Sequence, residues 1–280
     1  MEQTLISNEN VKIPKLLYGT AWKKEQTATL VELAIKSGFR GIDTAAQPKH
    51  YNEKLVGVAL NNLFAQGYTR ESLFIETKFT PKEGQDRQNI PYNPNDALEK
   101  QVLDSFEMSK KNLQTSYVDS YILHSPLFPF SNLQKVWRAM ESIYIQGEAK
   151  QLGISNCYDL STLEKLYDFA TIKPSVLQNR FYADSNYDVQ IRDWCQQKGI
   201  IYLAFWTLTA NPHILAHEIM LLLAKKYQKT PAQIFYRYLT QNNIVPLIGT
   251  TSPKHMKEDV SVFEFELENR ELQHIEQLLN

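Results

Sequence analysis

Eight short apolar segments alternate with helical patterns along the whole 280-residue chain, and this alternation limits the folds that the chain can adopt. The segments are rich in Ile, Leu, Val, Phe and Tyr, which is typical of strands buried on both faces. They lie at 16–21, 39–45, 73–79, 118–125, 149–155, 175–181, 199–205 and 244–249. Eight strands with helices between them predict a closed α/β barrel of the (β/α)₈ TIM type. We expect residues 1–280 to form a single domain, with an N-terminal strand or hairpin and a C-terminal helix.

A doubly wound open sheet is the main alternative, because it shows the same alternation of strands and helices. Its dinucleotide-binding form usually carries the sequence G-x-G-x-x-G after the first strand. Residues 18–22 of this chain are YGTAW instead, and only ten glycines are present in all. The barrel is therefore favoured over the open sheet.

Two helices show end signals in the sequence. Apolar residues at helical spacing run through 133–144, where Asn132 is expected to cap the helix and Gly147 to end it. Ser161 and Glu164 have the spacing of a capping box at the start of a later helix.

Composition limits the partners of this chain. A formal net charge of −1 argues against nucleic acid or an anionic membrane surface as the main partner. No apolar stretch approaches the roughly 18 residues of a membrane span, and the first residues lack the pattern of a signal peptide. Cys157 and Cys195 suit a reducing compartment and show no metal-type spacing. We expect a cytoplasmic protein, a monomer or weak oligomer, that binds no nucleic acid, membrane or metal.

Three of the predicted strands end in a titratable side chain. Asp43, Lys78 and His124 close the runs at 39–43, 73–78 and 121–124, and Tyr51 follows shortly after the first of them. Parallel-barrel enzymes build their active sites at the carboxyl ends of the strands. The sequence therefore predicts that these side chains meet as an acid/base site.

The motifs around these residues resemble those of the aldo-keto reductases, and the resemblance runs from about Ile13 to Leu279. The matching segments, in family order, are GFRGIDTA at 38–45, YNE at 51–53, Val56-Gly57, Thr77-Lys78, Leu123-His124, Gly153-Ile154-Ser155-Asn156 and Gln178. QPKHYNE at 47–53 and FWTLTANP at 205–212 are similar to a branch of fungal and plant sequences.

The resemblance implies a metal-free, NADP(H)-dependent reductase that converts aldehydes or ketones to alcohols. The cofactor would carry the hydride, and the protein would supply a proton and position the substrate. Tyr51 would be the acid, and a nearby Lys78 ammonium would favour its phenolate and so lower its pKa. Asp43 would hold Lys78 in place, and His124 would donate a hydrogen bond to the carbonyl oxygen.

The position of the acid departs from the family pattern. In most members the acidic Tyr stands two residues before the Asn-Glu pair, where this chain has His50, while Tyr51 stands directly before Asn52. A short insertion after Asp43 could bring Tyr51 to the same place. His50 is the alternative acid, since its ordinary pKa of about 6.5 suits proton donation without tuning.

The resemblance also implies a nicotinamide site at the centre of the barrel. Ser155, Asn156 and Gln178 match the positions that hold the carboxamide, and Phe205 matches the aromatic residue that stacks beneath the ring. The remaining positions assigned to the cofactor on this side are Thr20, Trp22 and Asp43 at strand ends, and Thr207 and Leu208 along the pyrophosphate.

The expected phosphate end lacks the cations that are usual in the family. Gly249 and His255 stand where a Lys and an Arg commonly bind the 2′-phosphate of NADP, and Lys254 or Lys257 could compensate. The same segment supplies hydroxyl donors and adenine-contacting positions, which are Thr250, Thr251, Ser252, Glu258 and Asp259. We therefore expect only a modest preference for NADPH, with NADH also accepted.

The substrate pocket is expected to be apolar and open. Its candidate walls are Trp22, Phe79, Phe128, Phe130 and Trp206. Residues 80–96 form a long loop at the same end and are a candidate lid. Members of the family with narrow specificity often have a longer C-terminal loop over the site, whereas this sequence ends at Asn280 directly after its last predicted helix, so the resemblance implies a tolerant pocket.

Two other functions remain open at this point. The barrel could be a regulatory protein that senses nicotinamide without turnover, although intact Asp43, Lys78 and His124 favour the enzyme. A metal-dependent hydrolase would need clustered ligands at the strand ends, where only His124 and Asp43 qualify.

Overall fold

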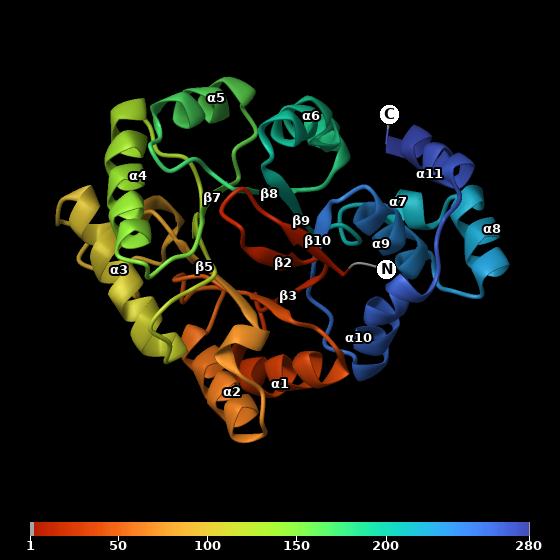
Figure 1. Cartoon of the computed structure of the whole chain (residues 1–280), viewed down its shortest axis with the longest axis horizontal. Helices are drawn as coiled ribbons and strands as arrows, with labels where there is room; N and C mark the ends of the chain where they lie inside the picture. Colours follow the sequence, from red (N-terminus) through yellow and green to blue (C-terminus); the bar gives the residue numbers. More distant parts are fainter. Residues whose placement is uncertain (1–2, 280) are drawn as a thin grey trace.

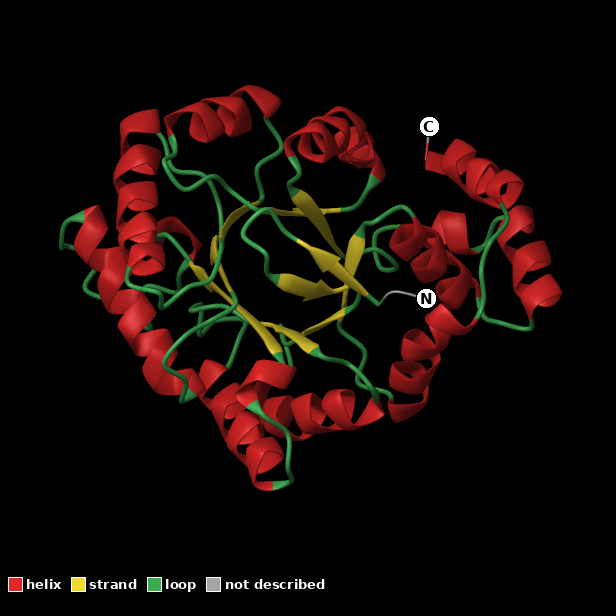
Figure 2. Ribbon diagram, in the orientation of Figure 1, coloured by secondary structure: helices red, strands yellow, loops and turns green. Residues whose placement is uncertain are grey.

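The computed structural model describes residues 3–279, which form a closed barrel of eight parallel strands inside a ring of helices (Figures 1 and 2). Each strand pairs with the next along the chain, and the last closes onto the first. The strands are β3 (Leu17–Gly19), β4 (Gly41–Asp43), β5 (Phe74–Phe79), β6 (Ser120–Leu123), β7 (Leu152–Ser155), β8 (Val176–Arg180), β9 (Ile201–Phe205) and β10 (Val245–Ile248). Every one lies inside a predicted segment, so the predicted (β/α)₈ barrel is confirmed.

The helices form a layer outside the barrel (Figure 2), and their apolar residues join the buried core between the helices and the strands. They are α1 (Thr27–Ser37), α2 (Glu53–Ala65), α3 (Leu98–Leu113), α4 (Phe130–Ile145), α5 (Leu160–Phe169), α6 (Val189–Lys198), α7 (Pro212–Leu215), α8 (Glu218–Tyr227), α9 (Pro231–Gln241), α10 (Pro253–Val260) and α11 (Asn269–Glu276). Within residues 3–279, no helix combines the length and the apolar character needed to cross a bilayer.

Both predicted N-caps were wrong by a few residues. Helix α4 starts after Pro129, so Asn132 lies in its first turn, while Gly147 follows the helix with φ = 76° as expected of a helix stop. Helix α5 is capped by Asp159, whose carboxylate accepts from the backbone N–H of Thr162 at 2.9 Å. An aspartate with extended backbone offers a stronger acceptor than Ser161, which lies inside the helix.

A hairpin closes the amino-terminal end of the barrel. Strands β1 (Thr4–Ile6) and β2 (Lys12–Pro14) pair antiparallel, which confirms the predicted N-terminal hairpin, and Figure 1 shows them across the barrel axis. The apolar residues that the hairpin and the strand starts bury together are Val11, Ile13, Leu17, Phe74, Ile122, Val176, Leu203 and Val245. This plug leaves the carboxyl end as the open end of the barrel.

Gly57 fixes the approach of α2 to α3. A Cβ on this residue would lie 2.1 Å from the backbone oxygen of Asn112, so a larger residue would push the two helices apart. The N-terminus of α2 follows Tyr51 directly, with Asn52 as its cap. The close packing therefore helps to set the position of Tyr51 at the open end of the barrel.

Loop 80–96 is tied down at its base. The side chain of Gln85 donates to the backbone oxygen of Ala46 at 2.7 Å, and the Tyr92 hydroxyl donates to that of Thr80 at 2.7 Å. Residues 86–89, beyond these bonds, are exposed. These bonds therefore restrict any lid movement to the outer part of the loop.

Candidate active site

A cavity of about 840 Å³ opens at the carboxyl end of the barrel. It is lined by most of the residues predicted from the sequence, which are Trp22, Asp43, Tyr51, His124, Ser155, Asn156, Gln178, Phe205, Thr207, Leu208, Gly249, Thr250, His255, Glu258 and Asp259. Two regions of this cavity differ in construction. We call the group Asp43, Tyr51, Lys78 and His124 the β4–β6 centre, and the group Lys23, Gly249, Thr250 and His255 the β10 end.

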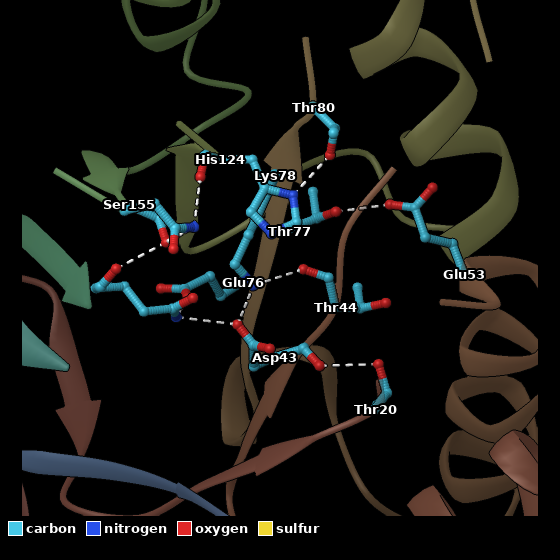
Figure 3. Close-up of polar contacts among 12 residues, drawn as sticks. Thr20, Asp43, Thr44, Glu53, Glu76, Thr77, Lys78, Thr80, His124 and Ser155 are labelled. Carbon is cyan, nitrogen blue, oxygen red and sulfur yellow. Dashed lines mark hydrogen bonds and ion pairs between the residues drawn. The ribbon is translucent and has the colours of Figure 1, made fainter. Parts of the chain in front are cut away.

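The β4–β6 centre is built on a buried ion pair. The Lys78 ammonium contacts the Asp43 carboxylate and donates to the backbone oxygen of Thr44 at 3.0 Å (Figure 3). Both residues are buried, and they lie near the carboxyl ends of β4 and β5 inside the barrel. Burial by itself would lower the pKa of Lys78, but its interactions with Asp43 first, and then with Tyr51 and Glu76, outweigh burial and raise the pKa. The lysine is therefore a permanent cation beneath the cavity.

Tyr51 lies over this cation. The Lys78 nitrogen is 5.5 Å from the centroid of the Tyr51 ring, and the ring centroid of His124 is 6.1 Å away. Burial raises the pKa of Tyr51 to about 12, and Lys78 acts in the opposite, expected direction without overcoming it. The phenol thus keeps its proton throughout the neutral range and can act as a donor.

His124 is held as a neutral ring. Its Nδ1 lies 2.6 Å from the Thr80 hydroxyl, and its backbone oxygen accepts from the Asn156 amide at 2.8 Å. Burial, assisted by the charges of Lys78 and His50, lowers the pKa of His124 to about 3. The ring can therefore donate one hydrogen bond from its other nitrogen without carrying a charge.

His50 occupies the rim of the cavity. Its ring packs on Trp22 with a centroid distance of 3.9 Å, and its Nδ1 lies 2.9 Å from the side-chain oxygen of Gln47. Partial burial and the charge of Lys49 lower the pKa of His50. Both His50 and Tyr51 line the cavity, but Tyr51 is the one that lies against Lys78.

Glu76 is a site residue that the sequence analysis missed. It lies two residues before Lys78 on β5, so the two side chains point to the same inner face (Figure 3). Its carboxyl group accepts from the Gln178 amide at 2.5 Å, and the same amide donates to Asp43 at 3.1 Å. Burial raises the pKa of Glu76 well above its ordinary value. The period-two spacing from Lys78 was a signal that could have revealed it.

The predicted carboxamide site is assembled on β7 and β8. The Ser155 hydroxyl donates to the backbone oxygen of Gln178 at 2.7 Å. The side-chain nitrogen of Gln178 is engaged by Asp43 and Glu76, so its oxygen is the polar atom left to accept from an amide N–H in the cavity. Phe205, on the neighbouring strand, is partly exposed to the same cavity.

Three residues in the cavity wall have a left-handed backbone although they carry side chains. Trp22, Asn156 and Trp206 have φ values of 64°, 53° and 59°. Such a conformation is unfavourable for bulky residues and persists where the surrounding structure enforces it. In each case it places a side chain at the mouth of the barrel.

At the β10 end, Lys23 takes a position that the sequence did not reveal. Its ammonium donates to the backbone oxygen of Gly249, and a Cβ on Gly249 would lie 3.6 Å from it. Desolvation lowers the pKa of Lys23. Lys254, by contrast, has a side chain that is 80% exposed and pairs with Glu258 at 3.6 Å. Lys23 is therefore the lysine that the fold brings to the strand end where the family commonly has one.

Three residues predicted to contact the cofactor do not line the cavity. Thr20 is buried and its hydroxyl donates to the backbone oxygen of Asp43 at 2.9 Å. Ser252 caps α10 by accepting from the backbone N–H of His255 at 3.3 Å. Thr251 is exposed beside it.

The predicted aromatic walls divide in the same way. Trp22 and Trp206 line the cavity and are 59% and 49% exposed. Phe79 is buried against Tyr92 at a centroid distance of 5.5 Å, and Phe130 packs on a neighbouring ring outside the cavity. Phe128 is exposed on the following loop. The prediction was wrong for Phe79 and Phe130, which pack on other rings away from the cavity, and Phe128 is exposed without lining it.

A metal centre finds no support among the described residues. Within 3–279, no group of three or more His, Cys, Asp or Glu side chains is close enough to hold an ion. Cys157 and Cys195 are both buried and unpaired with each other.

Comparison with known proteins agrees with this geometry. A sequence model of the aldo/keto reductase family matches residues 15–280. The chain belongs to this family. Glyoxal reductase of Bacillus subtilis is 32% identical over 248 residues, which are 89% of this chain and 82% of that protein. An uncharacterised oxidoreductase of Caenorhabditis elegans is 31% identical over 275 residues, which are 95% of this chain and 78% of that protein.

Solved structures show the same fold. An aldo/keto reductase from Brucella melitensis superposes with a TM-score of 0.84 at 27% identity and covers 99% of both chains. Aldo-keto reductases are oxidoreductases that act on small-molecule carbonyl compounds and generally use nicotinamide cofactors. This aldo-keto reductase is thus an oxidoreductase of the same general kind.

Proposed function

We propose that this aldo-keto reductase uses NADP(H) to reduce aldehydes or ketones to alcohols, with Tyr51 as the proton donor. The observation that carries the proposal is the arrangement of Asp43, Lys78 and Tyr51 at the β4–β6 centre. Asp43 holds Lys78, and the Lys78 nitrogen lies 5.5 Å from the Tyr51 ring at the cavity wall. A buried cation beneath a phenol has little other use, because burying an ion pair contributes little net stability.

The residues present fit a nicotinamide cofactor. Gln178 lines the cavity and two carboxyl groups engage its side-chain nitrogen, so its side-chain oxygen can accept from a carboxamide. Phe205 offers a ring face beside it, and Thr207 and Leu208 continue the wall toward the β10 end. When bound, the nicotinamide supplies the hydride for the carbonyl carbon.

The side chains of the β4–β6 centre supply the remaining steps. Tyr51 donates its proton to the carbonyl oxygen and becomes a phenolate, which Lys78 stabilises. Lys78 interacts more strongly with the phenolate than with the neutral phenol, so its effect is greatest as the proton leaves. We assign Thr80 as donor to Nδ1 of His124, so that the neutral ring donates to the carbonyl oxygen from Nε2. Water then restores the Tyr51 proton.

Lys23 supports the choice of NADP(H). It is a buried ammonium at the strand end where the expected 2′-phosphate would lie, with Thr250 and His255 in the same part of the cavity. A phosphate with close to two negative charges gains a charge-assisted hydrogen bond there that a ribose hydroxyl does not. The preference rests on one lysine, so it is modest. We further propose that the protein works in the cytoplasm as a monomer or weak oligomer.

Turnover of purified protein tests the function directly. NADPH is mixed with a panel of aldehydes and ketones, and the loss of reduced-nicotinamide absorbance is followed with wild type and Tyr51→Phe. We expect turnover by the wild type only. If NADPH binds but no carbonyl compound is reduced, the alternative of a nicotinamide-sensing regulatory protein replaces the enzyme.

A further inference from the structure

Arg180 brings a positive charge to the cavity that no described carboxylate neutralises. It ends β8 and lines the cavity. Among residues 3–279, no group accepts a hydrogen bond from its guanidinium, and its Nε is buried without a partner. Arg70 and Arg138, in contrast, each pair with a carboxylate and donate to backbone oxygens. An arginine with free donors in a cavity is incomplete without an acceptor.

Aromatic rings hold this guanidinium in place. Its central carbon lies 4.3 Å from the ring centroid of Trp206 and 5.1 Å from that of Tyr182. The Tyr158 hydroxyl accepts from the backbone N–H of Arg180 at 3.0 Å and fixes the end of the strand. Contacts with ring faces leave the in-plane N–H groups of the guanidinium available, so this planar fork of donors is oriented before any ligand binds.

The position of Arg180 relates it to the site of reduction. It lies two residues beyond Gln178 on the same strand, so both side chains share one face and Arg180 is about 7 Å further toward the opening. Its Cα pairs with that of Phe205 on β9. The cation therefore lies toward the opening of the cavity from Gln178, which is part of the predicted carboxamide site.

Strand order separates Arg180 from the β10 end. Strand β9 lies between β8 and β10, so Phe205 stands between Arg180 and Gly249. The phosphates of a cofactor that runs from Phe205 toward Gly249 lead away from Arg180. We therefore assign the part of the cavity next to Arg180 to the substrate.

We propose that Arg180 is a specificity-determining residue that binds a carboxylate on the carbonyl substrate, which makes oxo acids the preferred substrate class. This inference rests on the proposed function. A carboxylate matches the guanidinium fork with two parallel hydrogen bonds, and it replaces the water that Arg180 must otherwise keep. The wide mouth formed by Trp22 and Trp206 admits the rest of the molecule.

A matched pair of substrates tests the assignment. We compare para-carboxybenzaldehyde with its methyl ester, which differ in the charge and not in the aldehyde. A hydrogen-bonded charge of this kind contributes about 1.5–3 kcal/mol, which corresponds to a roughly 10- to 150-fold change in kcat/KM. We expect the wild type to prefer the acid by about that factor, mainly through KM. Arg180→Met should remove the preference while the ester changes by less than about threefold.

Two further variants sharpen the result. Arg180→Lys keeps the charge but not the fork, so it should retain only part of the preference. Arg270→Met removes an exposed arginine on α11 and should leave the preference as it is in the wild type. If Arg180→Met lowers kcat/KM equally for the acid and the ester, the proposal is overturned, and the arginine only supports the cavity wall.

Binding measurements separate the remaining outcomes. A raised Kd for NADPH in Arg180→Met, with unchanged discrimination between acid and ester, would place Arg180 on the cofactor and overturn the proposal. If the wild type reduces neither aldehyde, the proposed function fails. Calorimetric titration with para-carboxybenzaldehyde then tests the anion site without turnover. If Arg180 holds the carboxylate, the Kd for this acid should rise at least tenfold in Arg180→Met.

Discussion

The β4–β6 centre and the β10 end belong to one cavity but are built by different means. Asp43 and Lys78 are carried by strands, are buried, and contact each other. His255 is carried by the exposed first turn of α10, and Lys23 adds one buried charge there. Each charge of the first region is fixed by several neighbours, whereas the second offers few fixed groups to a ligand.

This difference separates chemistry from cofactor choice. Buried charges in a low-dielectric site act strongly, and removal of one leaves its partner uncompensated. Exposed charges are screened and contribute little. Substitutions at the β4–β6 centre should therefore change rates by orders of magnitude, and those at the β10 end should change cofactor affinity by about one order.

The largest effect is expected for Lys78→Met. Reduction should fall by at least the ~10²–10⁴-fold typical of acid catalysis, because nothing stabilises the Tyr51 phenolate. The melting temperature should fall too, since Asp43 loses its partner, at a cost of about 3–5 kcal/mol. The double variant Lys78→Met with Asp43→Asn should regain stability and stay inactive. Lys135→Met, on the exposed face of α4, is the control. Full activity in Lys78→Met would refute the proposed proton donor.

The next effect separates the two candidate acids. Tyr51→Phe keeps the ring and removes the proton, so kcat should fall by at least about 10²-fold while the Kd for NADPH stays nearly constant. His50→Gln should lower kcat by a smaller factor, because His50 packs on Trp22 at the rim of the cavity. An inactive His50→Gln together with an active Tyr51→Phe would reverse the assignment.

A smaller effect is expected at the β10 end. Lys23→Met removes the buried cation, so NADPH binding should weaken by about tenfold with little change for NADH. Lys254→Met removes a side chain that is 80% exposed and should change neither constant. Dissociation constants for both cofactors, measured by fluorescence titration, decide this. Equal weakening of both cofactors would show that Lys23 does not distinguish the 2′-phosphate.

The smallest change is expected from pH. The pKa of Tyr51 is about 12 and that of His124 about 3, so both keep one protonation state between them. The kcat for reduction should therefore be flat from about pH 7 to about pH 9 when proton transfer limits the rate. Burial lowers the pKa of His50 below its ordinary value, so a His50 acid would already be largely unprotonated at pH 7, and its protonated fraction would fall tenfold with each further pH unit. A tenfold fall in kcat per pH unit would identify His50 as the donor.

Local pattern alone predicted most of the frame. All eight strands and the strand-end positions of Asp43, Lys78 and His124 follow from short apolar runs, which depend on neighbours in sequence. Their meeting follows from one rule, that parallel strands in a barrel present their carboxyl ends together. The helix caps were less predictable, because Asp159 and Ser161 compete within one turn and backbone conformation selects between them.

Only the closed barrel decided the contacts between distant segments. Lys23 meets Gly249 across 226 residues, and Gln178 meets Glu76 across 102. Arg180 lies against Trp206 because β8 and β9 are in register there. Distances between such segments depend on strand order and register, which no local pattern contains. The sequence by itself therefore determined which groups reach the open end of the barrel, and the tertiary structure decided which of them touch, how deeply each is buried, and hence the raised pKa of Tyr51.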